Sequence, residues 1–253
     1  MPLTVRQFPC LSDNYGFLAR DEASGLVACI DTPDADAILA QLKTAGWTLS
    51  YILNTHWHPD HAGGNAGVKA ATGAIAIGPS EVTKIAALDG VVADGDVFAL
   101  GETRFSVMDV GGHTLGHIAY YDAADDIAFV GDALFALGCG RLFEGTPEQM
   151  WTSLSRLAAL PDRTTVYCAH EYTAANARFA LSVDDDAALQ ARAAEVFAAR
   201  ERGEPTVPTT IGLEKATNPF LRAPRLAERV GAPREPAYAA FAAVRAAKDV
   251  FKG

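Results

Sequence analysis

The sequence has no long hydrophobic run. None of its apolar segments approaches the roughly 18 residues that a membrane-spanning helix needs. Its first residues, MPLTVRQFPC, also lack the charged-then-apolar order of a secretory signal peptide. We therefore expect a cytoplasmic protein with no membrane partner.

Positive charge and cysteine are both scarce. The 253 residues include 21 lysines and arginines against 31 aspartates and glutamates, a formal net charge of −10. This balance would repel a phosphate backbone, so nucleic acid is not an expected partner. The four cysteines form no Cys-x-x-Cys pair, which argues against a disulfide scaffold or a cysteine-ligated zinc site and favours reduced, buried thiols.

The composition is that of an ordinary globular protein, with 49% hydrophobic and 21% charged residues. Short β-rich runs dominate the first part of the chain, among them LTVRQF, LVACID, TRFSVMDV and DIAFVGD, and several such runs end in glycine or aspartate. A helix is predicted over 34–46, where Gly46 ends it. Another is predicted over 147–160, where Thr146 can cap the N-terminus of the helix and Pro161 ends it. This order predicts packed sheets with helices outside them.

From Glu171 onward the pattern changes to alanine-rich helical segments, such as DAALQARAAEVFAARERG and AYAAFAAVRAAKDVF. A proline-bearing stretch, EPTVPTTIGLEKATNPFLRAPR, separates them. We therefore predict an α/β (α+β) protein with two domains, residues 1–172 and a helical domain at 173–253.

Three of the six histidines fall within six residues, in Thr55-His56-Trp57-His58-Pro59-Asp60-His61. Residues two apart in an extended chain point the same way, so His56 and His58 can offer their imidazoles to one ion. Pro59 then turns the chain, and Asp60 and His61 should point to a second place close by. Packing would gain little from so many polar groups together, whereas imidazole and carboxylate ligands suit zinc, iron or manganese.

Further candidate ligands lie where predicted strands end in loops. His113 follows Gly111-Gly112, Asp132 follows DIAFVG, and His170 ends TTVYCAH. With these residues the ligands divide evenly between two ions: His56, His58 and His113 for one, Asp60, His61 and His170 for the other, and Asp132 as a bridging carboxylate. His117 is left as a residue that orients a ligand or the substrate, or as ordinary structure.

The motif His56-x-His58-x-Asp60-His61 resembles the hallmark of the metallo-β-lactamase superfamily. A narrower resemblance, to glyoxalase II, the hydroxyacylglutathione hydrolases, rests on LSDNYGFL, THWHPDHAGGN, GHTLGH, VGDALFALGCGRLFEGT, AHEYT, NPFLR and VRAAKDVFK, which span nearly the whole chain. The resemblance implies an αββα sandwich as the catalytic domain, a C-terminal α-helical domain that helps to bind glutathione, and two metal ions. It also supports the ligand partition and marks His117 as a non-ligand.

The same resemblance implies where glutathione binds. Its contacts would fall on Arg141, Tyr172, Arg245 and Lys248, whose cationic members can hold the two glutathione carboxylates. Phe143 departs from the pattern, because eukaryotic members often have a tyrosine at that position. The phenol's hydrogen bond is absent here, so affinity for the glutathione peptide is expected to differ.

The implied reaction is hydrolysis of S-(2-hydroxyacyl)glutathione, chiefly S-D-lactoylglutathione, to glutathione and D-lactate, a step in methylglyoxal detoxification. A hydroxide held between two divalent metal ions would attack the thioester carbonyl. We expect the ions to be zinc, with iron or manganese as alternatives. Asp60 and Asp132 are the expected catalytic carboxylates, both acting as metal ligands. We expect a monomer.

Two other interpretations stay open on the sequence. A persulfide dioxygenase has the same fold, uses one iron and also accepts glutathione derivatives, but it would not need Asp60, His61 and His170 to hold a second ion. A metal-dependent sensor would bind metal and turn over no thioester. The stoichiometry of bound metal separates the dioxygenase from the hydrolase, and turnover of a thioester separates the sensor from the hydrolase.

Overall fold

The computed structural model describes residues 3–253, which form two compact units. The first contains the described residues up to Asp109 together with Gly116–Gly131, and the second contains Val110–Leu115 with Asp132–Gly253. The domain boundary predicted after residue 172 stays a prediction.

The first unit begins with a six-stranded sheet in the order β1-β2-β3-β4-β5-β6. The first three strands pair antiparallel and the last four pair parallel. The strands are β1 (Leu3–Cys10), β2 (Asn14–Asp21), β3 (Val27–Ile30), β4 (Tyr51–Leu53), β5 (Ile75–Gly78) and β6 (Gly90–Val91). Parallel strands need crossover connections, which here are α1 (Ala35–Ala45), α2 (Pro59–Ala62), α3 (Asn65–Thr72) and the 3₁₀ helix η1 (Ser80–Lys84).

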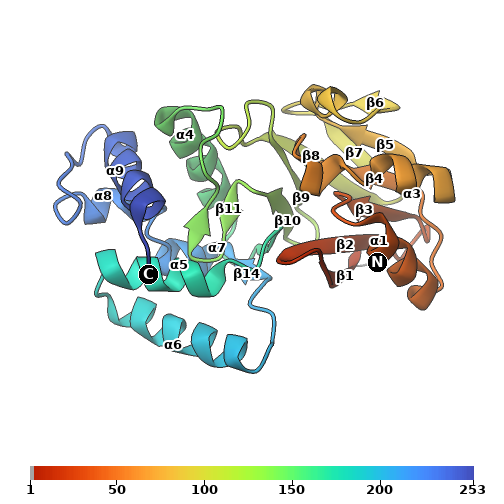
Figure 1. Cartoon of the computed structure of the whole chain (residues 1–253). Helices are drawn as coiled ribbons and strands as arrows, with labels where there is room; N and C mark the ends of the chain where they lie inside the picture. Colours follow the sequence, from red (N-terminus) through yellow and green to blue (C-terminus); the bar gives the residue numbers. More distant parts are fainter. Residues whose placement is uncertain (1–2) are drawn as a thin grey trace. The chain divides into compact units, whose positions relative to one another are not determined.

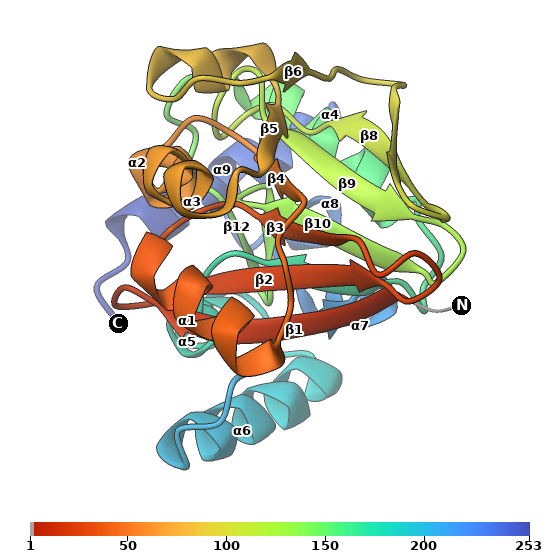
Figure 2. The same cartoon turned by 90° about the vertical axis from the view of Figure 1, so that its right-hand side faces the viewer.

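Helix α1 shows why this region folds as its sequence predicts. Asp34 caps the helix by accepting a hydrogen bond from the backbone N–H of Ala37, and Gly46 ends it in the left-handed conformation at φ 66°. The buried face of α1 carries Ile38 and Leu42, which join the hydrophobic core formed with Ile52 and other strand residues. Figure 2 shows α1 lying across the long strands β1 and β2.

A second sheet of the first unit consists of antiparallel strands in the order β10-β9-β8-β7. Its strands are β7 (Val97–Leu100), β8 (Thr103–Asp109), β9 (Ile118–Asp122) and β10 (Ile127–Gly131). The two sheets contact one another face to face. The ring of Phe17 on β2 lies 5.8 Å from that of Phe129 on β10, and Thr103 donates a hydrogen bond to buried Asp21. This sheet pair supports the loops that carry the histidine motif.

The second unit is mainly helical, with two short antiparallel strand pairs. The pairs are β11 (Leu134–Phe135) with β12 (Gly138–Cys139) and β13 (Thr165–Cys168) with β14 (Thr209–Thr210). The helices are α4 (Pro147–Ala158), α5 (Thr173–Val183), α6 (Ala187–Glu201), α7 (Ile211–Thr217), α8 (Ala223–Leu226) and α9 (Ala237–Val250). Figure 1 shows α5 and α6 running side by side, and their facing residues share a hydrophobic core with Leu137.

The predicted elements are largely confirmed. Thr146 accepts a hydrogen bond from the N–H of Gln149 at the start of α4, as the capping pattern predicts. The sequence did not reveal α7, which lies inside the proline-bearing stretch. Among residues 3–253, no helix is both long enough and apolar enough to cross a membrane.

The thiols are also as predicted, since all four cysteines are free and buried. Burial raises the pKa of Cys10 to about 12 and, despite the nearby Arg245, that of Cys139 to about 11. Burial likewise raises the pKa of Cys168 to about 12 and that of Cys29 well above its usual value. None of these cysteines is therefore a thiolate near neutral pH.

Candidate metal centre

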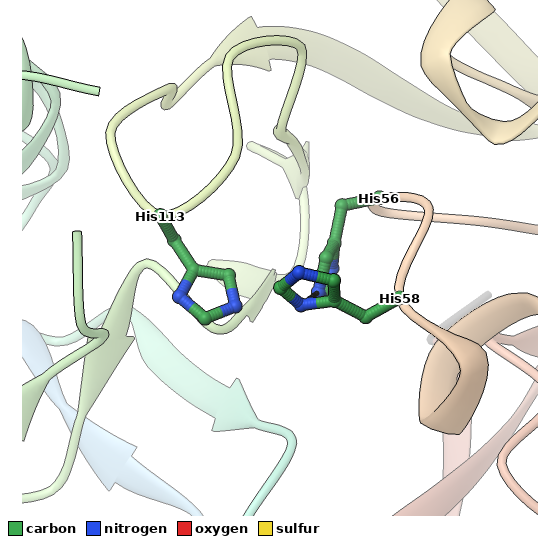
Figure 3. A group of neighbouring side chains, drawn as sticks. All are labelled: His56, His58 and His113. Carbon is green, nitrogen blue, oxygen red and sulfur yellow. Dashed lines mark hydrogen bonds between the residues drawn. The ribbon is translucent and has the colours of Figure 1, made fainter. Parts of the chain in front are cut away.

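The histidine motif occupies the loop between β4 and α2. His58 is the last extended residue before α2, and Pro59 starts the helix, where its fixed φ is favourable and no amide donor is needed. Figure 3 shows the imidazoles of His56 and His58 beside one another on this loop. Nε2 of His56 lies 3.1 Å from Nδ1 of His58. Two nitrogens bound to one tetrahedral zinc at 2.0–2.1 Å would lie about 3.3 Å apart, so the pair fits a shared ion.

Asp31, at the end of β3, orients two of these histidines. Its carboxylate accepts hydrogen bonds from Nδ1 of His61 at 2.8 Å and from both the backbone N–H and the hydroxyl of Thr55 at 2.7 Å. Because the Thr55 hydroxyl donates to Asp31, it accepts from Nδ1 of His56 at 3.0 Å. Both imidazoles therefore have Nε2 available as a metal ligand, which is how carboxylates commonly fix metal-binding histidines.

Sequence reasoning missed Asp31. It lies at the end of a predicted strand, LVACID, the same kind of position that pointed to Asp132. The side chains of Asp31, His56 and His61 come within 4.8 Å of one another, so they too could hold an ion. Because three donors already bind the Asp31 carboxylate, we assign Asp31 to orientation rather than to ligation.

Asp60 and His61 both lie on α2, as the motif predicts. Oδ2 of Asp60 is 3.7 Å from Nε2 of His61, and it also accepts a hydrogen bond from the side-chain amide of Asn14 at 3.1 Å. Asn14 belongs to the stretch LSDNYGFL, but the sequence did not indicate its role. The amide fixes the Asp60 carboxylate near His61.

His117 lies against the ligand candidate His56. The two rings stack at 4.4 Å with an angle of 18°. Gly131 makes room for this arrangement, because a Cβ there would come within 2.7 Å of the His117 ring and 2.6 Å of the Thr55 hydroxyl. The packing is consistent with a supporting residue, and its role stays a prediction.

In the second unit, Asp132 lies between two histidines. Its Oδ2 is 3.3 Å from Nε2 of His113, and its Oδ1 is 3.4 Å from Nε2 of His170. All three residues are buried. Each carboxylate oxygen thus lies near the ligand-to-ligand spacing from a different imidazole, so Asp132 is a candidate ligand beside both histidines.

The surroundings of His113 and His170 fix both rings. Nδ1 of His113 donates to the backbone carbonyl of Arg141 at 2.8 Å, which leaves Nε2 toward Asp132. The His170 ring stacks on Tyr172 at 4.6 Å and meets the edge of Phe135 at 5.8 Å. Figure 3 shows His113, the third labelled residue, projecting from its own loop, which follows β8.

The predicted glutathione contacts differ in exposure. Arg141 is largely exposed, with its Nε 3.7 Å from the Asp249 carboxylate. Phe143 is 62% exposed and packs edge-on against His113 at 5.2 Å. Tyr172 is partly exposed beside His170. All three side chains are therefore accessible near ligand candidates of the second unit.

The two predicted contacts on α9 are more enclosed. Arg245 is buried, where it donates to the carbonyl of Cys139 at 3.0 Å and pairs with Asp249. Lys248 donates to the carbonyl of Ala175 at 3.0 Å. Burial and then the charges of Arg245, Arg178 and Arg141 lower the pKa of Lys248 to about 8. The role of both residues in substrate binding stays a prediction.

Comparisons with known proteins agree with this fold. The sequence model of the metallo-beta-lactamase superfamily matches residues 29–170, and that of the hydroxyacylglutathione hydrolase C-terminus matches residues 171–251. Among solved structures, ETHE1 from Myxococcus xanthus is 27% identical in sequence, with a TM-score of 0.70. The match covers 96% of this chain and 90% of the ETHE1 chain. The protein TTHA1623, solved in a di-iron-bound form, is 25% identical with a TM-score of 0.61, covering 86% of this chain and 100% of its own.

The fold and the superfamily match thus define a metallo-β-lactamase-fold protein, of α/β class with a C-terminal helical region. Full-length relatives narrow this class. A hydroxyacylglutathione hydrolase of Erythrobacter litoralis is 58% identical, and the match covers 98% of this chain and 100% of the relative. A hydroxyacylglutathione hydrolase of Maricaulis maris is 57% identical, and the match covers 98% of this chain and 99% of the relative. The chain belongs to the hydroxyacylglutathione hydrolase family.

Proposed function

We propose that this protein hydrolyses the thioester of S-(2-hydroxyacyl)glutathione, chiefly S-D-lactoylglutathione, to glutathione and D-lactate. The near-full-length identity to hydroxyacylglutathione hydrolases supports the substrate class. The observation that carries a two-metal hydrolase is Asp132, whose two oxygens lie at nearly equal distances from the Nε2 atoms of His113 and His170.

We assign the seven candidate ligands to two ions. His56, His58 and His113 would hold one ion, Asp60, His61 and His170 would hold the other, and Asp132 would be shared between the two. The spacing of His56 to His58 and of Asp132 to its histidines supports the assignment. The donors suit zinc, and iron and manganese accept the same ligands. A di-iron form of a structural relative is consistent with such a pair.

Two divalent ions at these ligands would supply a water of lowered pKa and polarise the thioester carbonyl. The protein's own part is to hold that arrangement rigid. Asp31 and the Arg141 carbonyl fix the tautomers of His61 and His113, and Asn14 fixes the carboxylate of Asp60. A glutathione thiol with a pKa near 8.5 leaves as the thiolate, so the chain need not provide a dedicated general acid.

Cations of the second unit suit the glutathione carboxylates. The Arg141 guanidinium is accessible and can bind a carboxylate with two parallel hydrogen bonds, and Lys248 offers a compact charge. Arg245 can act beside them or, through its bond to Cys139, hold the loop that carries Arg141. Phe143 and Tyr172 would line the path of the peptide. We place this activity in a cytoplasmic monomer.

The test is thiol release from S-D-lactoylglutathione by the purified protein without oxygen, before and after a chelator, with the metals counted on the same sample. Hydrolysis that the chelator abolishes, with about two metals per chain, is the expected result. No hydrolysis, a single iron and oxygen uptake with glutathione persulfide would replace the proposal with a dioxygenase. Bound metal with no turnover of any thioester would point to a sensor.

A further inference from the structure

The short hairpin β11–β12 connects the three ligand candidates of the second unit. Asp132 lies two residues before the hairpin begins. Arg141 lies two residues after it ends, and its carbonyl holds His113. The ring of Phe135, in the hairpin itself, packs against His170. A shift of this hairpin would therefore move Asp132, His113 and His170 together.

Residues of α7 and its C-cap hold the hairpin backbone through buried polar side chains. Glu214 accepts a hydrogen bond from the N–H of Leu137 at 2.8 Å. Asn218 donates to the carbonyls of Phe135 at 3.1 Å and Gly138 at 2.9 Å. It also donates to Glu214 at 2.9 Å, so the two residues act as one clamp. Both are fully buried.

A third residue binds the turn of the hairpin from α5. The side-chain amide of Asn176 donates to the carbonyl of Ala136 at 3.1 Å and is buried. Position 138 requires glycine, because a Cβ there would lie 2.3 Å from the side-chain amide nitrogen of Asn176. The turn and the helix are therefore fitted closely to one another.

Leu137 shows how firmly the turn is held. It adopts φ 57°, a conformation that a side chain of this size rarely takes. Its side chain is fully buried in the hydrophobic core of α5 and α6. Such a backbone persists where several contacts determine it together, and these conformations cluster at functional sites.

The negative charge of Glu214 is fully compensated. Its Oε1 accepts hydrogen bonds from the guanidinium of Arg192 and from the hydroxyl of Thr209, the latter at 2.6 Å. Its Oε2 accepts hydrogen bonds from the backbone N–H of Leu137 and from the side-chain amide of Asn218. A buried carboxylate is tolerated only with such pairing and hydrogen bonding. The group that stabilises the hairpin is thus itself fixed by α6 and β14.

We propose that Glu214, Asn218 and Asn176 are positioning residues for the metal centre, because they hold the β11–β12 hairpin that sets Asp132, His113 and His170. The inference rests on the proposed metal-dependent function. It gives the C-terminal helices a role in metal binding, in addition to the substrate contacts expected of them. None of the three residues touches the metal or the substrate in this scheme.

Zinc affinity and kinetics of matched variants test this role. Asn176→Ala and Glu214→Gln are compared with Gln190→Ala, whose amide donates to the carbonyl of Asp185, and with Glu204→Gln, an exposed carboxylate paired with Arg202. The zinc dissociation constant is measured by chelator competition, and kcat and KM on the zinc-loaded enzyme. Melting temperatures are recorded with and without zinc.

We expect Asn176→Ala and Glu214→Gln to raise the zinc dissociation constant roughly tenfold, as changes to residues that support metal ligands do. Their melting temperature should then gain less from added zinc than that of the wild type, because stabilisation by a ligand follows its affinity. The two controls should match the wild type. Variants that are less stable yet bind zinc with wild-type affinity would overturn the proposal and leave a purely structural clamp.

Asn176→Ala decides the question if Glu214→Gln does not fold, because it removes a single hydrogen bond and no charge. The zinc measurement needs no substrate. A wild-type protein that binds two zinc ions but hydrolyses no glutathione thioester would therefore end the proposed function, while the effect of the clamp on metal affinity would still be decided.

Discussion

The carboxylate of Asp31 lies 2.8 Å from Nδ1 of His61. The same carboxylate holds the hydroxyl of Thr55, which in turn accepts the hydrogen bond from His56. One buried acidic residue thus sets the orientation and the tautomer of two imidazoles. Carboxylates in such positions also raise the basicity of a ligating histidine.

We expect Asp31→Asn to weaken metal binding 10- to 100-fold. In one rotamer the amide NH₂ would face the backbone N–H of Thr55, and in the other it would face both Nδ1 of His61 and the Thr55 hydroxyl, so either rotamer breaks part of the hydrogen bonding that holds this loop. Metal counting after dialysis and chelator competition measure the effect. Asp36→Asn, at an exposed position of α1, is the matched control. A variant that keeps two tightly bound ions and full turnover would remove Asp31 from the site.

Asp132→Ala removes both carboxylate oxygens that lie near His113 and His170. We expect fewer than two metals per chain and loss of turnover, because the shared ligand is gone. Elemental analysis and thiol-release kinetics on the same preparation check this. The control is Asp162→Ala, an exposed carboxylate that pairs with Lys215. Two bound metals at the wild-type rate would contradict the bridging assignment.

Arg141→Ala should chiefly raise KM, because in the proposed binding mode the guanidinium holds a glutathione carboxylate and not the reacting thioester. A tenfold rise with a small change in kcat is the expected size, about 1.4 kcal/mol of binding free energy. Steady-state kinetics of this variant and of Arg229→Ala, an exposed arginine paired with Asp185, provide the comparison. A collapse of kcat at unchanged KM would mean that Arg141 acts in the transition state.

Lys248 should make substrate binding sensitive to pH. Burial and the neighbouring arginines lower its pKa to about 8, so the folded protein loses this charge as the pH rises through 8. We expect KM to increase between pH 7 and 9, and Lys248→Arg to remove the increase because guanidinium stays charged. A KM that does not change with pH in the wild type would exclude Lys248 from carboxylate binding.

The same pKa shift has a defined effect on stability. The unfolded chain holds the Lys248 proton up to the ordinary value of 10.5, whereas the folded protein releases it near 8. Between these values the unfolded state binds more protons, so the contribution of this group to stability increases with pH. Below pH 8 the charged lysine disfavours folding. Urea unfolding of the wild type and of Lys248→Met at pH 7 and 10 measures the difference.

The candidate metal ligands could be proposed from the sequence because their signal is local. Three histidines and an aspartate within six residues, after a strand and before a proline, need no knowledge of the rest of the fold. The signals that begin and end helices are equally local. The structure has the two predicted helices, α1 between Asp34 and Gly46 and α4 after Thr146.

The supporting residues could not be predicted because their roles depend on tertiary contacts. Asp31 is 24 residues from Thr55 and 30 from His61, and nothing near it in the chain marks it as a partner of either. Glu214 lies 77 residues from Leu137. Glu214 lies on α7, which is short and belongs to a proline-bearing stretch, so the sequence pattern did not predict this helix. Thr210 nevertheless caps its N-terminus. Burial of Arg245 likewise follows from the packing of α9 and not from its alanine-rich sequence.

The burial of all four cysteines has a consequence for a protein that releases a thiol. With pKa values of about 11 and above, fewer than about one in a thousand of these groups is ionised at pH 7.5, and exchange with disulfides needs the thiolate. The protein is thereby protected from forming mixed disulfides with the glutathione pool in which its substrate is made. A thiol-reactive dye added to the reaction will consequently report the liberated glutathione and leave the folded protein unlabelled.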